Sequence, residues 1–168
     1  MKRVFLIGYM CAGKTTIGTA LAQQLGYRFI DLDQYIEQLE GKSVSAIFAD
    51  KGEAYFRQLE KKALLDMFLQ EGVVVATGGG TPCQGNNMAL MNQHGITVFL
   101  NPSLDELANR LAIGKQTRPL LKDKTDAEMH LFIEKMMQQR LPYYRQAHYT
   151  CSGNLTTGAT EIINLLGL

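Results

Sequence analysis

The residues from Gly8 to Thr15 are the clearest candidates for chemistry. They read Gly8-Tyr9-Met10-Cys11-Ala12-Gly13-Lys14-Thr15 and match the phosphate-binding pattern G-x-x-x-x-G-K-[ST]. In such a loop, here called the P-loop, backbone N–H groups surround the β-phosphate, and the dipole of the following helix adds positive potential. Lys14 would reach the β- and γ-phosphates, and the Thr15 hydroxyl would bind Mg²⁺ directly. We therefore predict an ATP site with contacts from Cys11, Ala12, Gly13, Lys14, Thr15 and Thr16.

Cys11 is unusual within this loop, where small residues or glycine are common. One interpretation is a tolerated small side chain. The other is a thiol that the surrounding N–H groups and Lys14 make more acidic. The sequence leaves both interpretations open.

Two carboxylates, Asp31 and Asp33, flank Leu32 at the end of a short predicted strand. Alternation along a strand would place both on one face, directed toward the P-loop. Asp31 could then hold Mg²⁺ through a water molecule, while Asp33 accepts hydrogen bonds from an acceptor hydroxyl. A helix-capping role ahead of residues 34–39 is the alternative, and Asp33 could serve as both cap and ligand.

Alternating strands and helices are needed to position these groups. Apolar runs predict five strands, at Val4–Ile7, Arg28–Asp31, Val73–Ala76, Thr97–Leu100 and Tyr149–Cys151. Helical patterns lie between them, in the segment from Ile17 to Gly26 and at Val44–Asp50, Glu53–Gln70, Leu104–Ala112, Asp126–Arg140 and Ala159–Leu166. This alternation predicts a three-layer α/β/α sandwich with a central five-stranded parallel sheet.

The segment Ile113–Lys124 differs from its surroundings. It is polar and basic, contains Gly114 and Pro119, and separates two predicted helices. A loop of about twelve residues is long for a compact domain and is often a lid over a site. The excess of basic residues from Arg110 to Arg145 suits an anionic ligand, although a solvated helix face would look the same.

Composition narrows the class of protein. The chain has 168 residues, of which 46% are hydrophobic and 20% charged, and its net charge is +1. These values are typical of a globular protein and argue against nucleic-acid binding through bulk charge. The widely spaced Cys11, Cys83 and Cys151 favour a reduced, cytoplasmic compartment. No apolar run reaches the length of a signal-peptide core or a membrane span.

Further motifs resemble those of the shikimate kinases, which are P-loop kinases with a nucleoside monophosphate kinase-like fold. The matching segments are Gly41-Lys42-Ser43-Val44-Ser45-Ala46-Ile47-Phe48, Gly52-Glu53-Ala54-Tyr55-Phe56-Arg57-Gln58-Leu59-Glu60, Thr77-Gly78-Gly79-Gly80, Arg118-Pro119-Leu120-Leu121 and Arg140-Leu141-Pro142-Tyr143-Tyr144. The resemblance implies transfer of the γ-phosphoryl group of ATP to the 3-hydroxyl of shikimate, with Mg²⁺, in chorismate and aromatic amino-acid biosynthesis. It further implies one kinase domain over residues 1–168, with a substrate-binding helical segment at about 33–61 and a lid at about 113–124.

The resemblance also assigns roles to individual residues. Asp33 would bind the acceptor hydroxyls and act as the base, and Lys14 and Arg118 would complete the catalytic set. Arg57 and Arg140 offer planar guanidinium groups suited to the substrate carboxylate. The other implied contacts are Gly78, Gly79 and Gly80 for shikimate, and Arg110 and Arg118 for ATP.

Several neighbouring residues keep two interpretations. Glu60 follows Arg57 by three residues, so it could orient Arg57 or form an ordinary surface pair with it. Phe48 and Phe56 could line the substrate ring or belong to the core. The segment 153–157 lacks the arginine or proline that often flanks adenine in this family, which puts nucleobase contacts there in doubt.

The sequence disfavours two other functions. A kinase for another small hydroxy acid, such as gluconate, is disfavoured by Arg57, Arg140 and the G-x-S-V…G-E-x-x-F-R pattern. A non-catalytic nucleotide-binding module predicts loss of at least one of Lys14, Asp33, Arg57, Arg118 and Arg140, and all five are present. We expect a monomer that binds shikimate and ATP, without nucleic-acid or membrane partners.

Overall fold

Five parallel strands form the central sheet in the computed structural model, which describes residues 2–114 and 123–168. The strands are β1 (Arg3–Ile7), β2 (Arg28–Asp31), β3 (Val73–Ala76), β4 (Ile96–Leu100) and β5 (Tyr149–Cys151), arranged in the order β2-β3-β1-β4-β5. Phe5 of β1 is in register with Val75 of β3 and with Thr97 of β4. The apolar residues of these three inner strands are buried, apart from the partly buried Ile96, because helices cover both faces of the sheet. All five strands predicted from the sequence are present.

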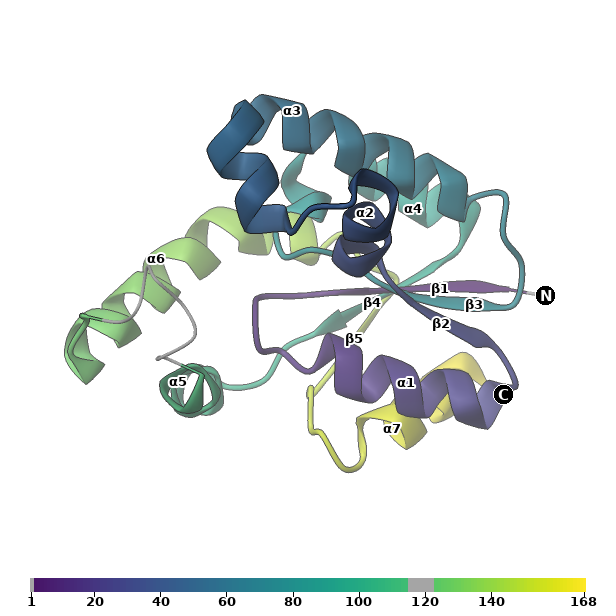
Figure 1. The fold of residues 1–168 in the computed structure, drawn as a ribbon. Helices are drawn as coiled ribbons and strands as arrows, with labels where there is room; N and C mark the ends of the chain where they lie inside the picture. Colours follow the sequence, from purple (N-terminus) through teal and green to yellow (C-terminus); the bar gives the residue numbers. More distant parts are fainter. Residues whose placement is uncertain (1, 115–122) are drawn as a thin grey trace.

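Helices form the two outer layers (Figure 1). One face carries α1 (Lys14–Leu25) and α7 (Gly158–Leu166), which pack against each other. The other face carries α3 (Val44–Met67) and α4 (Asn87–His94), with α2 (Leu32–Glu40) packed against α3. The predicted three-layer sandwich is therefore confirmed.

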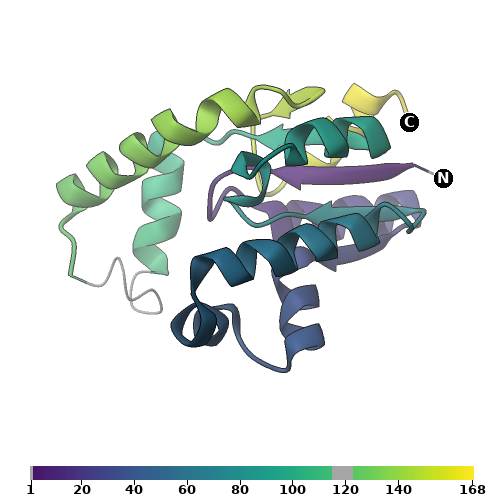
Figure 2. The ribbon, with the colours of Figure 1, turned by 90° about the horizontal axis from the view of Figure 1, so that it is seen from above.

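Two further helices extend beyond the carboxyl ends of the strands. They are α5 (Leu104–Ile113) and α6 (Asp126–Tyr144), which pack against each other and reach past the sheet on the side of the P-loop (Figure 2). The predicted lid at 113–124 connects them. Its residues 115–122, including Arg118, lie outside the described residues, so the assignment of the lid stays a prediction.

Some boundaries differ from the sequence-based predictions. The two helices expected at Val44–Asp50 and Glu53–Gln70 are joined in α3, which bends at Gly52, where φ is 79°. That backbone conformation favours glycine, so the predicted break exists as a bend. Helix α6 continues past Arg140 through Pro142, which removes one backbone donor without ending the helix.

Two elements were not predicted. They are α4 and the short 3₁₀ helix η1 (Thr81–Cys83). Met88 and Met91 are buried on α4, but the rest of its sequence has too little apolar periodicity to mark a helix. Among the described residues, no helix is long and apolar enough to cross a membrane.

Candidate active site

A cleft of about 530 Å³ lies at the carboxyl edge of the sheet. It brings together side chains and backbone from segments far apart in the sequence, as expected for a parallel α/β sheet. Ten residues predicted for the site line it: Cys11, Gly13, Lys14, Thr15, Thr16, Asp31, Asp33, Gly78, Gly79 and Arg110. Ala12, which belongs to the P-loop, is instead fully buried.

The P-loop forms a tight turn that leads into α1 beside this cleft. The N–H of Ala12 donates to the carbonyl of Tyr9 at 3.1 Å, which closes a tight turn. Cys11 has a φ of 62°, so a residue with a side chain occupies a left-handed conformation there. Gly13 precedes α1, and no described side chain caps the helix. The N–H groups of the first turn of α1 are thus available to an anion.

Lys14 is partly buried at the base of this loop. Its Nζ donates to the carbonyl oxygens of Gly8 and Tyr9, at 2.6 and 2.8 Å. Burial lowers the pKa of Lys14 to about 8, and the nearby Asp33 carboxylate opposes that change. The ammonium group is therefore poorly solvated and would gain from a phosphate partner.

Thr15 and Asp31 form the hard-oxygen pair expected of a Mg²⁺ site. The hydroxyl of Thr15, on α1, donates to Oδ2 of Asp31, at the end of β2, at 3.2 Å. Both residues line the cleft. Mg²⁺ is commonly held in proteins by one or two such oxygens together with water and substrate phosphates. The residues present therefore fit the predicted metal.

The route by which Asp31 and Asp33 reach the cleft differs from the prediction. Asp31 is the last residue of β2, and the chain turns into α2 at Leu32, so strand alternation does not relate the two carboxylates. Asp31 Oδ1 accepts the N–H groups of Asp33 and Gln34 at 3.1 and 3.3 Å. Asp31 is thus the helix cap, so the alternative in which Asp33 caps the helix is wrong. The Asp33 carboxylate is left facing the cleft.

Asp33 is held in an environment that disfavours its charge. Oδ1 is buried and accepts no hydrogen bond from the described residues. Burial raises the pKa of Asp33 from 3.8 to about 6, with further contributions from the charges of Asp31 and Glu60, whereas Lys14 lowers it. A carboxylate with this pKa is mostly ionised at neutral pH and can accept a proton.

Arg57 and Arg140 approach successive residues of the glycine loop, defined here as Gly78–Gly80. A Cβ on Gly79 would lie 2.9 Å from Arg140 Nη1, and one on Gly80 would lie 2.7 Å from Arg57 Nη2. Any side chain at either position would therefore displace a guanidinium group. The two cations face the same short stretch of backbone beside Asp33.

Glu60 forms an ion pair with Arg57, and its burial decides between the two interpretations of this pair. Arg57 Nη1 donates to Glu60 Oε1 at 2.9 Å, and the Glu60 side chain is only 1% exposed. A second carboxylate, Glu53, accepts from Arg57 Nη2 at 3.3 Å and is 65% exposed. Because its main partner is buried, Arg57–Glu60 is not an ordinary surface pair.

Arg140 has a different setting from Arg57. Its guanidinium lies over the Tyr9 ring, 5.5 Å from the centroid, and it forms no ion pair with a carboxylate in residues 2–114 or 123–168. One turn further along α6, the Tyr144 hydroxyl donates to the carbonyl of Gly79 at 2.6 Å. Tyr144 is not among the predicted site residues, although its spacing of four from Arg140 places both on one helix face.

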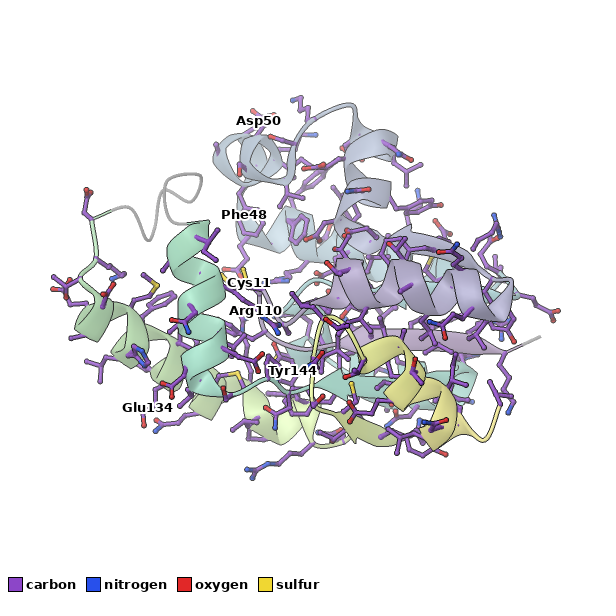
Figure 3. The ribbon with its side chains drawn as sticks, turned by 90° about the horizontal axis from the view of Figure 1, so that it is seen from below. Cys11, Phe48, Asp50, Arg110, Glu134 and Tyr144 are labelled. Atoms are coloured by element: carbon purple, nitrogen blue, oxygen red, sulfur yellow. The ribbon has the colours of Figure 1, made fainter. Side chains whose placement is uncertain are left out.

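Arg110 lines the cleft and lies beside Cys11 of the P-loop (Figure 3). Its guanidinium donates to the carbonyl oxygens of Cys11 and Gly153, at 3.1 and 3.0 Å, and to Glu106. It is therefore turned toward the P-loop, and the interpretation as a solvated helix face is wrong for this residue. Leu155 and Ile113, which were not predicted, line the cleft beside it.

The two phenylalanines pack against each other on α3. Their ring centroids are 4.7 Å apart, and Phe56 is buried in the core. Phe48 is partly exposed and packs against the same core. Core packing is thus the better interpretation for Phe56.

Comparisons with known proteins agree with this geometry. The family model for shikimate kinase matches residues 10–166. A shikimate kinase from Parabacteroides distasonis is 49% identical over 150 residues, covering 89% of this chain and 87% of that protein. The crystal structure of a shikimate kinase from Bacteroides thetaiotaomicron has a TM-score of 0.94 and 44% identity, covering 99% of both chains.

A second solved structure is a shikimate kinase from Acinetobacter baumannii in complex with shikimate. It has a TM-score of 0.88 and 34% identity, and covers 99% of this chain and 93% of that one. This chain therefore has a P-loop, an acidic pair and a glycine loop gathered at one cleft, and it is similar to known shikimate kinases over nearly its whole length. On this evidence, the chain belongs to the shikimate kinase family.

Proposed function

We propose that this chain transfers the γ-phosphoryl group of ATP to the 3-hydroxyl of shikimate, giving ADP and shikimate 3-phosphate on the route to chorismate and aromatic amino acids. The observation that carries this proposal is the convergence of Asp33, Arg57 and Arg140 on the glycine loop, next to the P-loop. Two cations and one carboxylate complement an acceptor that carries one carboxylate and several hydroxyls. Family membership supports the same assignment.

The nucleotide would bind along the P-loop and the first turn of α1. Lys14 would exchange its contacts with Gly8 and Tyr9 for the β- and γ-phosphates. Thr15 would hold Mg²⁺ directly and Asp31 would hold it through water; when bound, the ion neutralises charge on the phosphates. Arg110 and Leu155 lie together beside Gly13 in the cleft, and their guanidinium face and apolar side chain suit a nucleobase.

The acceptor would bind at the glycine loop. Arg57 and Arg140 would hold the carboxylate of shikimate, which leaves its 3-hydroxyl for Asp33. During transfer, the hydroxyl proton passes to Asp33 as the new oxygen–phosphorus bond forms. The bond between the γ-phosphorus and its bridging oxygen breaks, and ADP leaves with that electron pair. By family resemblance, Arg118 would contact the phosphoryl group being transferred.

The reaction itself can be tested by measuring ADP release from MgATP. We expect rapid release with shikimate, and slow release with gluconate or without an acceptor. Mass spectrometry of the product should show one added phosphate on shikimate. Equal rates with gluconate would contradict the proposed acceptor, and equal rates without any acceptor would indicate an ATPase.

Arg57 and Arg140 should control affinity for shikimate. In Arg57→Ala or Arg140→Ala, the substrate carboxylate would lose a partner in a partly desolvated site, which costs about 2–5 kcal/mol. We therefore expect shikimate binding to weaken roughly 30-fold to several-thousand-fold, as measured by calorimetric titration. Arg145→Ala is the matched control, because Arg145 is exposed and directly follows α6. This variant should bind shikimate normally.

The same titration separates these residues from Arg118. Arg118→Ala should lower kcat with much less change in shikimate affinity, because its contact is expected only as the phosphoryl group moves. Comparable losses of affinity in Arg118→Ala and Arg57→Ala would show that this division of roles is wrong.

A further inference from the structure

The hydroxyl group of Thr81 lies behind the Arg57–Glu60 pair. Thr81 Oγ1 donates to Glu60 Oε2 at 2.6 Å, while Glu60 Oε1 accepts from Arg57 Nη1 at 2.9 Å. Thr81 is 0% exposed and Glu60 is 1% exposed, so solvent has little access to either oxygen of the Glu60 carboxylate. Each oxygen of this buried carboxylate therefore has its own protein donor.

Thr81 is itself fixed in position by its backbone. Its N–H donates to the carbonyl of Gly78 at 3.1 Å, and its carbonyl accepts from Asn87 Nδ2 at 2.9 Å. Lys61 then donates to Asn87 Oδ1 at 2.8 Å. The hydroxyl is thus held at a defined place relative to the glycine loop, because η1 begins directly after Gly80.

Arg57 has two carboxylate partners that would orient it differently. Glu60 holds it from the protein interior, whereas Glu53 is 65% exposed and makes longer contacts, at 3.3 and 3.4 Å. A carboxylate fixed by one donor is freer to rotate than one fixed by two, because the second hydrogen bond defines the plane of the group. Loss of the Thr81 hydroxyl would also leave Glu60 Oε2 buried without this donor.

We propose that Thr81 is a positioning residue for shikimate binding, whose hydroxyl fixes Glu60 and thereby holds the Arg57 guanidinium against Gly80. The inference rests on the proposed role of Arg57 in binding the substrate carboxylate. It predicts an effect on shikimate affinity that exceeds the effects on ATP affinity and on kcat, because Thr81 contacts neither the P-loop nor Asp33 through a hydrogen bond in the described residues.

Thr81→Val removes the hydroxyl and keeps the shape of the side chain. We expect it to weaken shikimate binding roughly tenfold by calorimetric titration, with changes of less than about threefold in kcat and in the KM for ATP. Thr81→Ser keeps the hydroxyl and should restore affinity to within about threefold of the original protein. Equal losses in the valine and serine variants would overturn the proposal, because the methyl group rather than the hydroxyl would then matter.

Thr97→Val is a matched control for stability. Thr97 is also 0% exposed, and its hydroxyl donates to Asn92 and accepts from His148 N–H, but it lies near the amino end of β4, away from the cleft. Both valine variants should lower the melting temperature, whereas only Thr81→Val should weaken shikimate binding. If shikimate affinity falls equally in both, the effect is a general loss of stability and the proposal is wrong.

The double variant Thr81→Val with Arg57→Ala distinguishes this inference from the role of Arg57. If Thr81 acts through Arg57, the double variant should bind shikimate within about twofold of Arg57→Ala alone. Multiplied losses would overturn the inference. Normal shikimate binding by Arg57→Ala would instead show that the proposed role of Arg57 fails, and the inference with it. Weak binding by Arg57→Ala with normal binding by Thr81→Val would overturn the inference alone.

Discussion

Lys14→Met is expected to lower kcat by roughly 10³-fold or more while the protein remains folded. The ammonium of Lys14 donates to the carbonyl oxygens of Gly8 and Tyr9 in the P-loop, at 2.6 and 2.8 Å. Charge that develops on the phosphates during transfer would be stabilised by this group in a poorly solvated cleft, where one lost donor already costs 10²–10³-fold in other enzymes. Methionine keeps an unbranched side chain, one atom shorter than that of lysine, and removes the charge and its hydrogen bonds.

The fold should tolerate this change because desolvation of the charged Lys14 ammonium group lowers the stability of the folded state. Its pKa is lowered from 10.5 to about 8, so the folded state binds the proton less tightly than the unfolded state does. The resulting cost is fully present below about pH 8 and disappears as the pH rises through the unfolded value near 10.5. Replacing the charge removes that cost at neutral pH, which offsets the loss of two hydrogen bonds.

Single-turnover kinetics with MgATP and shikimate, beside a thermal melting curve, would test this prediction. Lys62→Met changes an exposed lysine of α3 and should leave both kcat and the melting temperature nearly unchanged. Turnover by Lys14→Met within tenfold of the original protein would contradict the assignment of the P-loop as the phosphate site. A large fall in melting temperature would contradict the electrostatic argument alone.

Local patterns in the sequence were sufficient to predict most of the fold. The inner strands consist of consecutive apolar residues, and the P-loop has a fixed pattern between a strand and a helix, so each can be recognised within about ten residues. Gly52 likewise marked the bend in α3 from its residue type. The short elements η1 and α4 could not be found this way, because neighbouring segments stabilise them more than their own periodicity does.

The candidate site was predictable only where a role belongs to a residue type in a local motif. Lys14 and Thr15 have such roles, and both line the cleft. The exact function of Asp31 depended on where β2 ends and α2 begins, and boundaries are poorly specified by sequence. The contacts of Thr81 with Glu60 and of Tyr144 with Gly79 join residues 21 and 65 positions apart, so no local pattern could reveal them.

Asp33→Asn is expected to change activity and stability in opposite directions. The amide keeps the shape of the side chain but cannot accept the hydroxyl proton, so we expect kcat to fall roughly 10²–10⁴-fold, with a smaller change in shikimate affinity. In the original protein, kcat/KM for shikimate should decline as the pH falls below about 6, because protonation of Asp33 removes the base. Retention of near-normal turnover in Asp33→Asn across neutral pH would show that Asp33 only positions the substrate.

Stability provides the independent half of the argument. Because the pKa of Asp33 is raised from 3.8 to about 6, the folded state binds its proton more tightly than the unfolded state. The associated stabilisation is fully present below about pH 4 and is lost as the pH rises through about 6. At pH 7.5 the ionised group therefore costs on the order of 2 kcal/mol, since one pKa unit corresponds to about 1.4 kcal/mol and part of the carboxylate remains solvated.

Removing that cost should raise the melting temperature of Asp33→Asn by roughly 4–8 °C at pH 7.5, and by much less at pH 4.5. Asp50→Asn supplies a control of opposite sign. The hydrogen bond and charge of Lys42 lower the pKa of Asp50 at an exposed ion pair, so neutralising Asp50 should not stabilise the fold. Calorimetric melting of both variants at the two pH values decides the matter. If Asp33→Asn gains the same stability at pH 4.5 and at pH 7.5, the gain does not arise from the buried charge. If the gain is confined to pH 7.5, the site keeps its proton acceptor at the expense of the stability of the fold.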